Sequence, residues 1–156
     1  MPVADRTAGA YFSDMRYECD APNGHTWFRL ETADEADAEA VLMAHAVDKF
    51  YRRAEDIARA SYQPGPGLER DIGLKGHIAR SMPLFLTLRD EDGAALVTAM
   101  IPQQRTTDLR EPSIRPILVA HANKDPFPRF AEAIDALARH LGVPLPADEC
   151  YPYRRG

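Results

Sequence analysis

The chain has 156 residues, of which 45% are apolar and 28% are charged, so we expect one globular domain with its own core and not a disordered chain. Its net charge of -5 argues against a nucleic-acid binder, because such proteins gain much of their affinity by neutralising phosphates. No stretch reaches the roughly 18 apolar residues of a membrane span, and no secretory signal is present, so we expect a cytoplasmic protein without a membrane partner.

The composition carries two further indications. Arg outnumbers Lys, and Ala and Pro are abundant, which is typical of a GC-rich bacterial genome. Cys19 and Cys150 lie far apart and form no CxxC pair. We therefore expect reduced thiols, with Cys19 as a small buried side chain, although a disulfide stays open.

The first element is a β-hairpin centred on Asn23-Gly24, the favoured pair for a type I′ turn of two residues. Closing the turn there places Pro22 opposite His25 and sets the register. One face is then apolar and the other carries opposite charges. The predicted pairs are Cys19 with Phe28, Tyr17 with Leu30, Glu18 with Arg29, and Arg16 with Glu31.

A single long helix is predicted over residues 32–62. Thr32 and Glu35 form a capping box at its start, and the Pro-Gly repeats after Gln63 end it. Its apolar positions recur every three or four residues and draw one stripe. The stripe consists of Ala36, Ala40, Met43, Val47, Phe50, Ala54, Ile57 and Ser61.

A second hairpin is predicted over residues 83–102, around Asp92-Gly93. Both of its faces are largely apolar, which is typical of strands in the middle of a sheet or beneath a partner. A fifth strand follows over residues 115–122, and Pro116 places it at an edge or begins it. The predicted pairs of the hairpin are Leu88 with Val97, Leu86 with Ala99, Leu84 with Ile101, Thr87 with Thr98, and Phe85 with Met100.

The last helix starts at the Asp125 cap with Pro126 in its first turn and ends at Gly142. Its predicted buried stripe is Phe127, Phe130, Ile134, Leu137, Ala138 and Leu141. The expected fold is therefore α+β, with an antiparallel sheet of about five strands, two main helices and the order ββα-loop-βββα. The predicted domain covers residues 11–146, with flexible or irregular termini at 1–10 and 147–156.

Patterns that carry catalytic chemistry are weak in this sequence. The histidines show no metal-ligand spacing, and no serine stands in a GxSxG turn. We therefore predict no catalytic residue, no metal and no cofactor, and favour a protein that is not an enzyme. Among the histidines, His45 and His140 are expected to be solvated and His25 exposed, whereas His77 and His121 are the two with notable positions.

Two long polar connections, residues 63–80 and 103–113, are candidates for a ligand site, because long loops in compact domains are often functional. The first contains several glycines but lacks the GK[ST] ending of a P-loop, so turns explain its glycines more simply. Cationic and imidazole side chains in the two loops would meet an anionic ligand. The predicted ligand-binding residues are Arg70, Lys75, His77, Arg105 and Arg110.

Trp27 falls on the charged face of the first hairpin in the predicted register. With Arg29 and Arg16 it makes a candidate surface for a protein partner, since Trp and Arg are enriched at binding hot spots. The favoured alternative is that Tyr11 and Phe12 cover Trp27 and form a second small core. The doubly apolar second hairpin also needs cover, from helices on opposite faces, from the tail, or from the second subunit of a homodimer.

Two functional hypotheses follow. The leading one is a non-catalytic protein-binding or adaptor domain, and it predicts a flat apolar patch. The alternative is a small-molecule or nucleotide-binding domain, with an enzyme as one form of it, and it predicts that loops 63–80 and 103–113 converge on one concave pocket. Nucleic-acid binding would need an aligned row of basic residues: Arg16, Arg29, Arg52 and Arg53.

Overall fold

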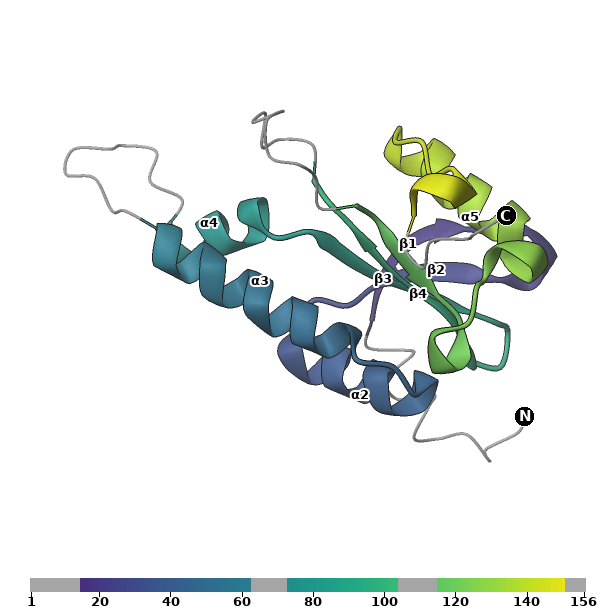
Figure 1. Ribbon diagram of the computed structural model, residues 1–156, viewed down its shortest axis with the longest axis horizontal. Helices are drawn as coiled ribbons and strands as arrows, with labels where there is room; N and C mark the ends of the chain where they lie inside the picture. The colour runs from purple at the N-terminus through teal and green to yellow at the C-terminus, as the bar shows by residue number, and fades with distance from the viewer. Residues whose placement is uncertain (1–14, 63–72, 104–114, 151–156) are drawn as a thin grey trace.

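The computed structural model describes residues 15–62, 73–103 and 115–150, which form three layers. An antiparallel sheet of five strands lies between helices on both faces (Figure 1). The strands stand side by side in chain order, so the sheet is a meander interrupted once by helices. The strands are β1 (Arg16–Asp20), β2 (Thr26–Arg29), β3 (Leu84–Arg89), β4 (Ala95–Ile101) and β5 (Ile117–Val119).

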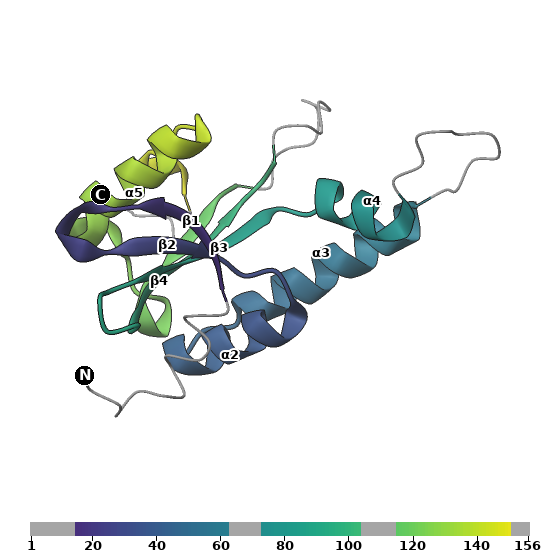
Figure 2. The same cartoon turned by 180° about the vertical axis from the view of Figure 1, so that it is seen from behind.

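The α+β class and the antiparallel sheet of five strands are confirmed, but the number of helices differs from the prediction. Where two main helices were expected, the described residues contain four: α2 (Ala33–Met43), α3 (Val47–Ser61), α4 (Gly73–Ser81) and α5 (Phe127–Leu141). Helices α2 and α3 lie on one side of the sheet and α5 on the other, as the view from behind also shows (Figure 2).

The prediction of one helix over residues 32–62 is wrong because the chain breaks between α2 and α3. Ala44 adopts the left-handed conformation with φ 53° and ends α2. No Gly or Pro marks this position, so the sequence gives no warning of the break. The capping box of Thr32 and Glu35 at the start of α2 is confirmed.

The break also changes which residues of α3 are buried. Tyr51 and Ala58 face the core, whereas Phe50 and Ile57 of the predicted stripe are 48% and 59% exposed. A helix that restarts at Val47 is free to take its own rotation about its axis, and packing on the sheet sets that rotation.

The first hairpin has the predicted turn but not the predicted register. Asn23 and Gly24 both have positive φ, at 67° and 76°, as a type I′ turn requires. Pro22 has no N–H to donate to His25, and the Ala21 N–H bonds the His25 carbonyl instead, at 2.9 Å. A second irregularity between Tyr17 and Cys19 shifts the strands again. As a result Cys19 lies opposite Trp27, and Tyr17 lies opposite Phe28.

The charged pairs of this hairpin survive the shift of register. The Arg29 side chain donates to Glu18, and the Arg16 side chain donates to Glu31 at 3.1 Å. These two predicted pairs are confirmed, since long side chains reach a partner even when the backbone positions are offset.

The second hairpin has the predicted pairing from Leu84 with Ile101 to Leu88 with Val97; an irregularity between Leu88 and Arg89 then shifts the register, so that Arg89 lies opposite Ala95. Strand β5 pairs with β4 at the edge of the sheet, directly after Pro116, in agreement with the expected edge position. Both faces of this hairpin are covered by helices of the same chain. Its apolar character therefore does not call for a second subunit.

Two separate hydrophobic cores result from the three layers. One lies between the sheet and α5 and contains Trp27, Leu86 and Leu137, and the other lies under α2 and α3 and contains Phe28, Tyr51 and Phe85. Helix α5 ends at Gly142 as predicted, with φ 68°, but it begins one residue later than predicted, with Pro126 in the N-cap position; the Asp125 side chain still accepts from the Phe127 N–H at 3.0 Å.

The C-terminal part of the described chain packs against the α5 side of the sheet. A short turn covers Ala147–Glu149, and Cys150 after it is fully buried in the same core as Cys19. Both cysteines are free thiols, as expected. The predicted mobile residues 1–10 lie outside the described residues.

Candidate functional site

A groove opens between α3, α4 and the start of α2, and we call it the α3–α4 groove. Its main cavity has a volume of about 690 Å³. A smaller cavity of about 120 Å³ shares Glu31, Tyr51, Ala79 and Met82 with it and extends to Arg29, Phe85 and Gln103. Further residues that line the main cavity are Thr32, Glu55, Arg59, Leu74, Lys75 and Ile78.

Tyr51 forms the floor of this groove. Its ring packs against Phe85 with centroids 4.9 Å apart, and only 5% of the residue is exposed. Among the described residues its hydroxyl has no hydrogen-bond partner. Burial, followed by the negative charges of Glu55, Glu35 and Glu31, raises the pKa of Tyr51 to about 12. The hydroxyl is therefore a neutral donor at physiological pH.

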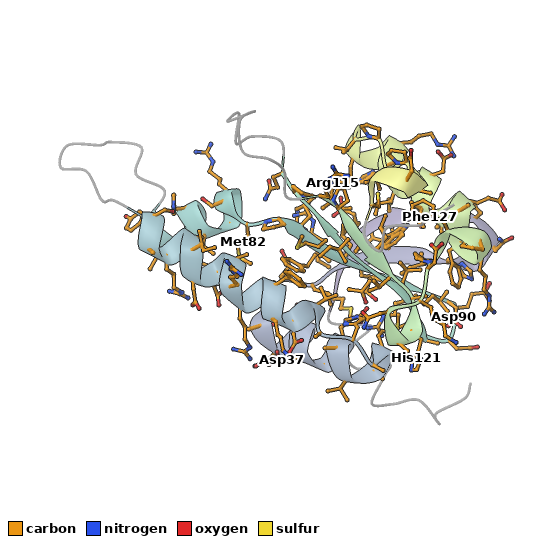
Figure 3. All side chains as sticks on the ribbon, viewed as in Figure 1. Asp37, Met82, Asp90, Arg115, His121 and Phe127 are labelled. Atoms are coloured by element: carbon orange, nitrogen blue, oxygen red, sulfur yellow. The ribbon has the colours of Figure 1, made fainter. Side chains whose placement is uncertain are left out.

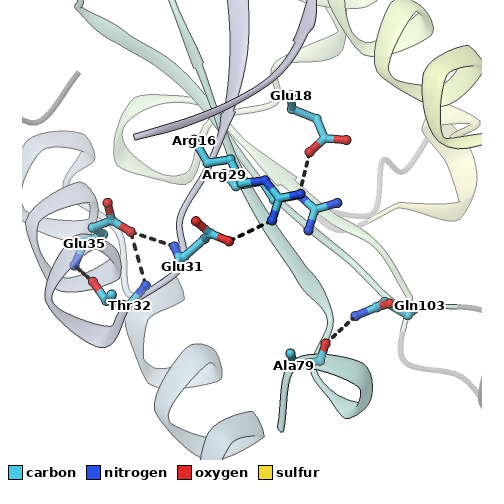
Figure 4. A network of polar contacts seen from close by, with 8 residues as sticks. All are labelled: Arg16, Glu18, Arg29, Glu31, Thr32, Glu35, Ala79 and Gln103. Atoms are coloured by element: carbon cyan, nitrogen blue, oxygen red, sulfur yellow. Dashed lines mark hydrogen bonds and ion pairs between the residues drawn. The ribbon is translucent and has the colours of Figure 1, made fainter. Parts of the chain in front are cut away.

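The charges around the groove are mixed, and most of them are already paired. Glu55 lies 3.7 Å from Arg59 on the next turn of α3. Glu31 receives the bond from Arg16 (Figure 4). Lys75 at the start of α4 is exposed and forms no ion pair with any described residue.

Apolar side chains of α4 and the segment after it form one wall. Ile78 and Met82 face the groove and pack against the core beneath α3. Figure 3 shows Met82 where α4 meets the sheet. Leu74 on the first turn of α4 is 37% exposed and also lines the cavity. The groove thus combines an apolar wall with polar groups at its floor and rim.

Gln103 ties the end of β4 to the end of α4. Its side-chain amide donates to the carbonyl oxygens of Ala79, at 3.1 Å, and Met82, at 2.6 Å (Figure 4). These carbonyls belong to the last turn of α4 and the residue after it, where helix carbonyls lack intrahelical partners. The described ends of the predicted loops 63–80 and 103–113 therefore meet beside one concave space.

His77 lies on α4 but contacts α3 and the helix's own last turn. Its Nε2 is 2.8 Å from the Ser61 hydroxyl and 3.5 Å from the Ser81 hydroxyl, and its ring is 5.5 Å from that of Tyr62. The Ser61 hydroxyl donates its proton to the Ala58 carbonyl, so the His77 Nε2 is the donor in the first of these bonds. Ser61 is consequently not arranged as an activated nucleophile.

The predicted site residues are thus only partly brought together. Lys75 lines the main cavity, and Arg29 lines the smaller one while it bonds Glu18. Arg16 reaches the groove only through Glu31. The predicted residues Arg70, Arg105 and Arg110 lie outside the described residues.

Trp27 is fully buried, which corrects its predicted place on the charged face. The shifted register turns it toward α5, where its indole N–H donates to the Ala133 carbonyl at 2.8 Å. The favoured interpretation, a Trp27 inside a core, is right about burial, but α5 supplies the cover. Whether Tyr11 and Phe12 contact it lies outside the described residues.

A buried polar network near the α2 end of the sheet was missed by sequence reasoning. Arg89 donates to Glu39 at 2.6 Å, and the Thr98 hydroxyl donates to the other oxygen of Glu39 at 2.6 Å. Arg89 also bonds the Thr87 hydroxyl and the Gly93 carbonyl, at 3.1 and 3.0 Å. A charged residue at the end of an otherwise apolar strand was the available signal, since buried charges require partners.

His45 completes this network and corrects its predicted solvation. It lies in the break between α2 and α3, half-buried, with Nε2 2.8 Å from the Thr98 hydroxyl. Its Nδ1 accepts the Val47 N–H, so the neutral ring carries its proton on Nε2 and donates to Thr98. Burial lowers the pKa of His45, against the opposing effect of Glu39 and Asp48.

A separate cavity of about 530 Å³ lies between α5 and residues 143–146 and is lined mainly by apolar side chains. None of the predicted site residues that the structure describes lines it. Among the described residues no group of three or more His, Cys, Asp or Glu side chains is placed to hold a metal ion. Within the same residues, no helix is both long enough and apolar enough to span a bilayer.

Comparison with known proteins gives no relative: no family model matches the chain, and no curated protein or solved structure is significantly similar to it.

Proposed function

We propose that this protein is a ligand-binding domain whose small-molecule ligand lies in the α3–α4 groove. The observation that carries the proposal is the bond from Gln103 to the end of α4, which brings the described ends of both candidate loops to one concave space. A cavity of about 690 Å³ is within the usual range of small-molecule sites, roughly 300–1,000 Å³.

The groove also has the composition of a binding site. Small-molecule sites combine apolar walls with a few polar groups that fix orientation. Here Ile78 and Met82 supply the wall, and the Tyr51 hydroxyl and Lys75 supply polar groups without partners among the described residues. The arrangement supports reversible binding. It offers no activated nucleophile and no base paired with one in the described residues.

A test is a fragment screen followed by NMR chemical-shift mapping of the labelled protein. We expect shifted resonances at residues of the groove, such as Ile78 and Gln103, and not around α5. An Ala79→Trp variant should abolish them, because Ala79 lines both cavities and an indole there fills the space. The control is Ala60→Trp, also an exposed helical alanine but outside the groove. Fragments that map elsewhere, or that still bind the Ala79→Trp variant, would contradict the proposal.

The adaptor hypothesis keeps one specific observation in its favour. Phe50 and Ile57 are about half exposed on α3, and Ile57 lies two residues, or about 200°, around the helix from Glu55 of the groove. The first partner to test is a second copy of the chain, by sedimentation velocity of the wild type and of an Ile57→Asp variant. A concentration-dependent dimer that the substitution abolishes would favour this function, and a monomer at all concentrations would count against self-association.

A further inference from the structure

The chemistry of the α3–α4 groove also indicates which class of ligand it binds. We infer that the groove takes a small anionic amphiphile, in which a carboxylate or similar group is joined to an apolar body. This inference rests on the proposed function and goes beyond it, because a groove of this size could equally serve a neutral or a cationic molecule.

The anionic group is assigned by Lys75, the one cation of the groove that has no ion partner among the described residues. Arg59 lies near Glu55, and Arg29 is bonded to Glu18, so each of these positive charges already has a carboxylate. Glu31 has Arg16 as its partner. Lys75 has no ion partner among the described residues, so it is the group that gains most from a ligand carboxylate.

The position of Lys75 strengthens this assignment. It is the third residue of α4, which begins at Gly73 and runs for 9 residues. The first turn of a helix carries a partial positive charge from the aligned peptide dipoles, which favours an anion nearby. The charge of Lys75 and the dipole of α4 therefore both favour an anion at this end of the groove.

The apolar body of the ligand is assigned by the wall and floor. Leu74 and Ile78 lie on one face of α4, and Met82, the residue after the helix, continues the same spacing of four; all three line the cavity. Leu74 is an apolar side chain that is 37% exposed, and an alkyl chain or aromatic ring along this row would cover it. Burial of the apolar surface of the ligand against this row favours binding through the hydrophobic effect.

The floor adds a requirement for an acceptor. Tyr51 lines the cavity, and its hydroxyl has no protein acceptor in the described part of the chain. As a neutral phenol it can donate to a carbonyl, ether or carboxylate oxygen that reaches the floor. A cationic ligand fits less well, because it would meet Lys75 while the groove carboxylates Glu31 and Glu55 already lie beside arginines.

The test uses three probes with one apolar body: 3-phenylpropanoate, 3-phenylpropanamide and 3-phenylpropylamine. Each is titrated into the labelled full chain and followed by NMR at the resonances of the groove. We expect the carboxylate to bind at least five times more tightly than the amide, and the amine to bind most weakly. In the Lys75→Gln variant, the affinity for 3-phenylpropanoate should fall to the affinity for 3-phenylpropanamide. The exposed Lys49→Gln variant is the control and should change nothing, since Lys49 lies outside the groove.

The outcomes separate this inference from the proposed function. Equal binding of the three probes in the groove, or a carboxylate preference that survives Lys75→Gln, overturns the anionic assignment while the groove remains a binding site. Failure of all three probes to shift groove resonances also overturns it, and the broader fragment screen then decides the proposed function by itself. A preference for the amine would reverse the assigned charge.

Discussion

Glu39 on α2 and Arg89 at the end of β3 form an ion pair with 2.6 Å between Oε1 and Nη2, and each side chain is only 1% exposed. The pair joins the helical layer to the sheet, and Thr98 on β4 bonds the second oxygen of Glu39. Buried charges lose their hydration, so such a pair persists only when its hydrogen bonds are made. Here Arg89 has further acceptors in Thr87 and Gly93.

Removing one member of this pair should therefore be costly. We expect Arg89→Ala to lower the free energy of unfolding by about 3–5 kcal/mol, because Glu39 is left buried without its cation. Urea unfolding measures the loss. The matched control is Arg139→Ala, which breaks an exposed pair with Asp135 and should change stability by only about 0–1 kcal/mol. Equal losses in the two variants would contradict the burial of the pair.

The pair should also be replaceable by apolar side chains. We expect the double variant Glu39→Leu with Arg89→Met to recover most of the stability lost in Arg89→Ala, since removal of both charges leaves none unpaired. A double variant as unstable as the single one would show that the hydrogen bonds to Thr87, Thr98 and Gly93 carry the effect.

The free energy of unfolding should fall as the pH is lowered through the range in which His45 takes up a proton. Burial lowers the pKa of His45 in the folded protein below its ordinary value of 6.5, with Glu39 and Asp48 opposing and His121 adding to the effect. The unfolded chain thus binds a proton that the folded chain resists, so stability is complete above about pH 6.5 and is lost as the pH falls toward the folded pKa. Protonation of Nδ1 would also remove the acceptor of the Val47 N–H.

The measurement is urea unfolding between pH 8 and pH 5.5 for the wild type and His45→Asn. Asn can place an oxygen where Nδ1 stands and keep the bond from Val47, but it does not titrate. We expect a smaller dependence on pH in the variant. Parallel pH profiles for the two proteins would exclude His45 as the titrating group.

The environment of Trp27 can be read directly, because it is the one tryptophan of the chain. We expect a blue-shifted emission and little quenching by iodide, since the indole is fully buried beneath α5. Trp27→Phe should cost about 1 kcal/mol for the lost bond to Ala133, in addition to a packing loss. A red-shifted, quenchable emission would instead favour the exposed position that the unshifted hairpin register predicts.

Gln103 should affect the groove more than the whole fold. In Gln103→Ala the carbonyls of Ala79 and Met82 lose their side-chain donor, at a cost of about 0.5–1.5 kcal/mol for each bond. We expect faster hydrogen exchange in α4 and weaker binding of groove fragments, with α5 unchanged. Uniform acceleration of exchange in α4 and α5 would mean that Gln103 supports general stability only.

Tyr51→Phe tests the floor of the groove with little change in shape. Because the Tyr51 hydroxyl bonds no described residue, its removal should leave the unfolding midpoint nearly unchanged. A hydrogen bond from this hydroxyl to a ligand contributes about 1 kcal/mol, so its loss should make the affinity about five times weaker. Titration of the fragments that bind the wild type measures this. Unchanged affinity would show that the hydroxyl does not contact the ligand.

Features that depend on neighbouring residues could be predicted from the sequence. The capping box of Thr32 and Glu35, the bounds of α5 between Asp125 and Gly142, and the turn at Asn23-Gly24 are all set by local backbone chemistry. The pairing of β3 with β4 belongs to the same group, because the short turn around Asp92-Gly93 fixes the register of the two strands.

The candidate site could be predicted only in part. Lys75 was found because a long loop with basic residues is a general signal, but Tyr51, Met82 and Gln103 were not, because they come from three different elements. No sequence pattern predicts that the end of β4 reaches the end of α4. That contact forms when α3 and α4 fold back over the sheet.

The sequence by itself therefore determined the strands, the turns and the helix caps, since each depends on residues that are close together along one segment. Only the tertiary structure decided that Ala44 breaks a continuous helical pattern, that Trp27 turns toward α5, and that Glu39 meets Arg89 across 50 positions. The physical reason is the same in each case. Packing between layers offers several kcal/mol to whichever rotation or register buries the most apolar surface, and this exceeds the local preferences of a single residue.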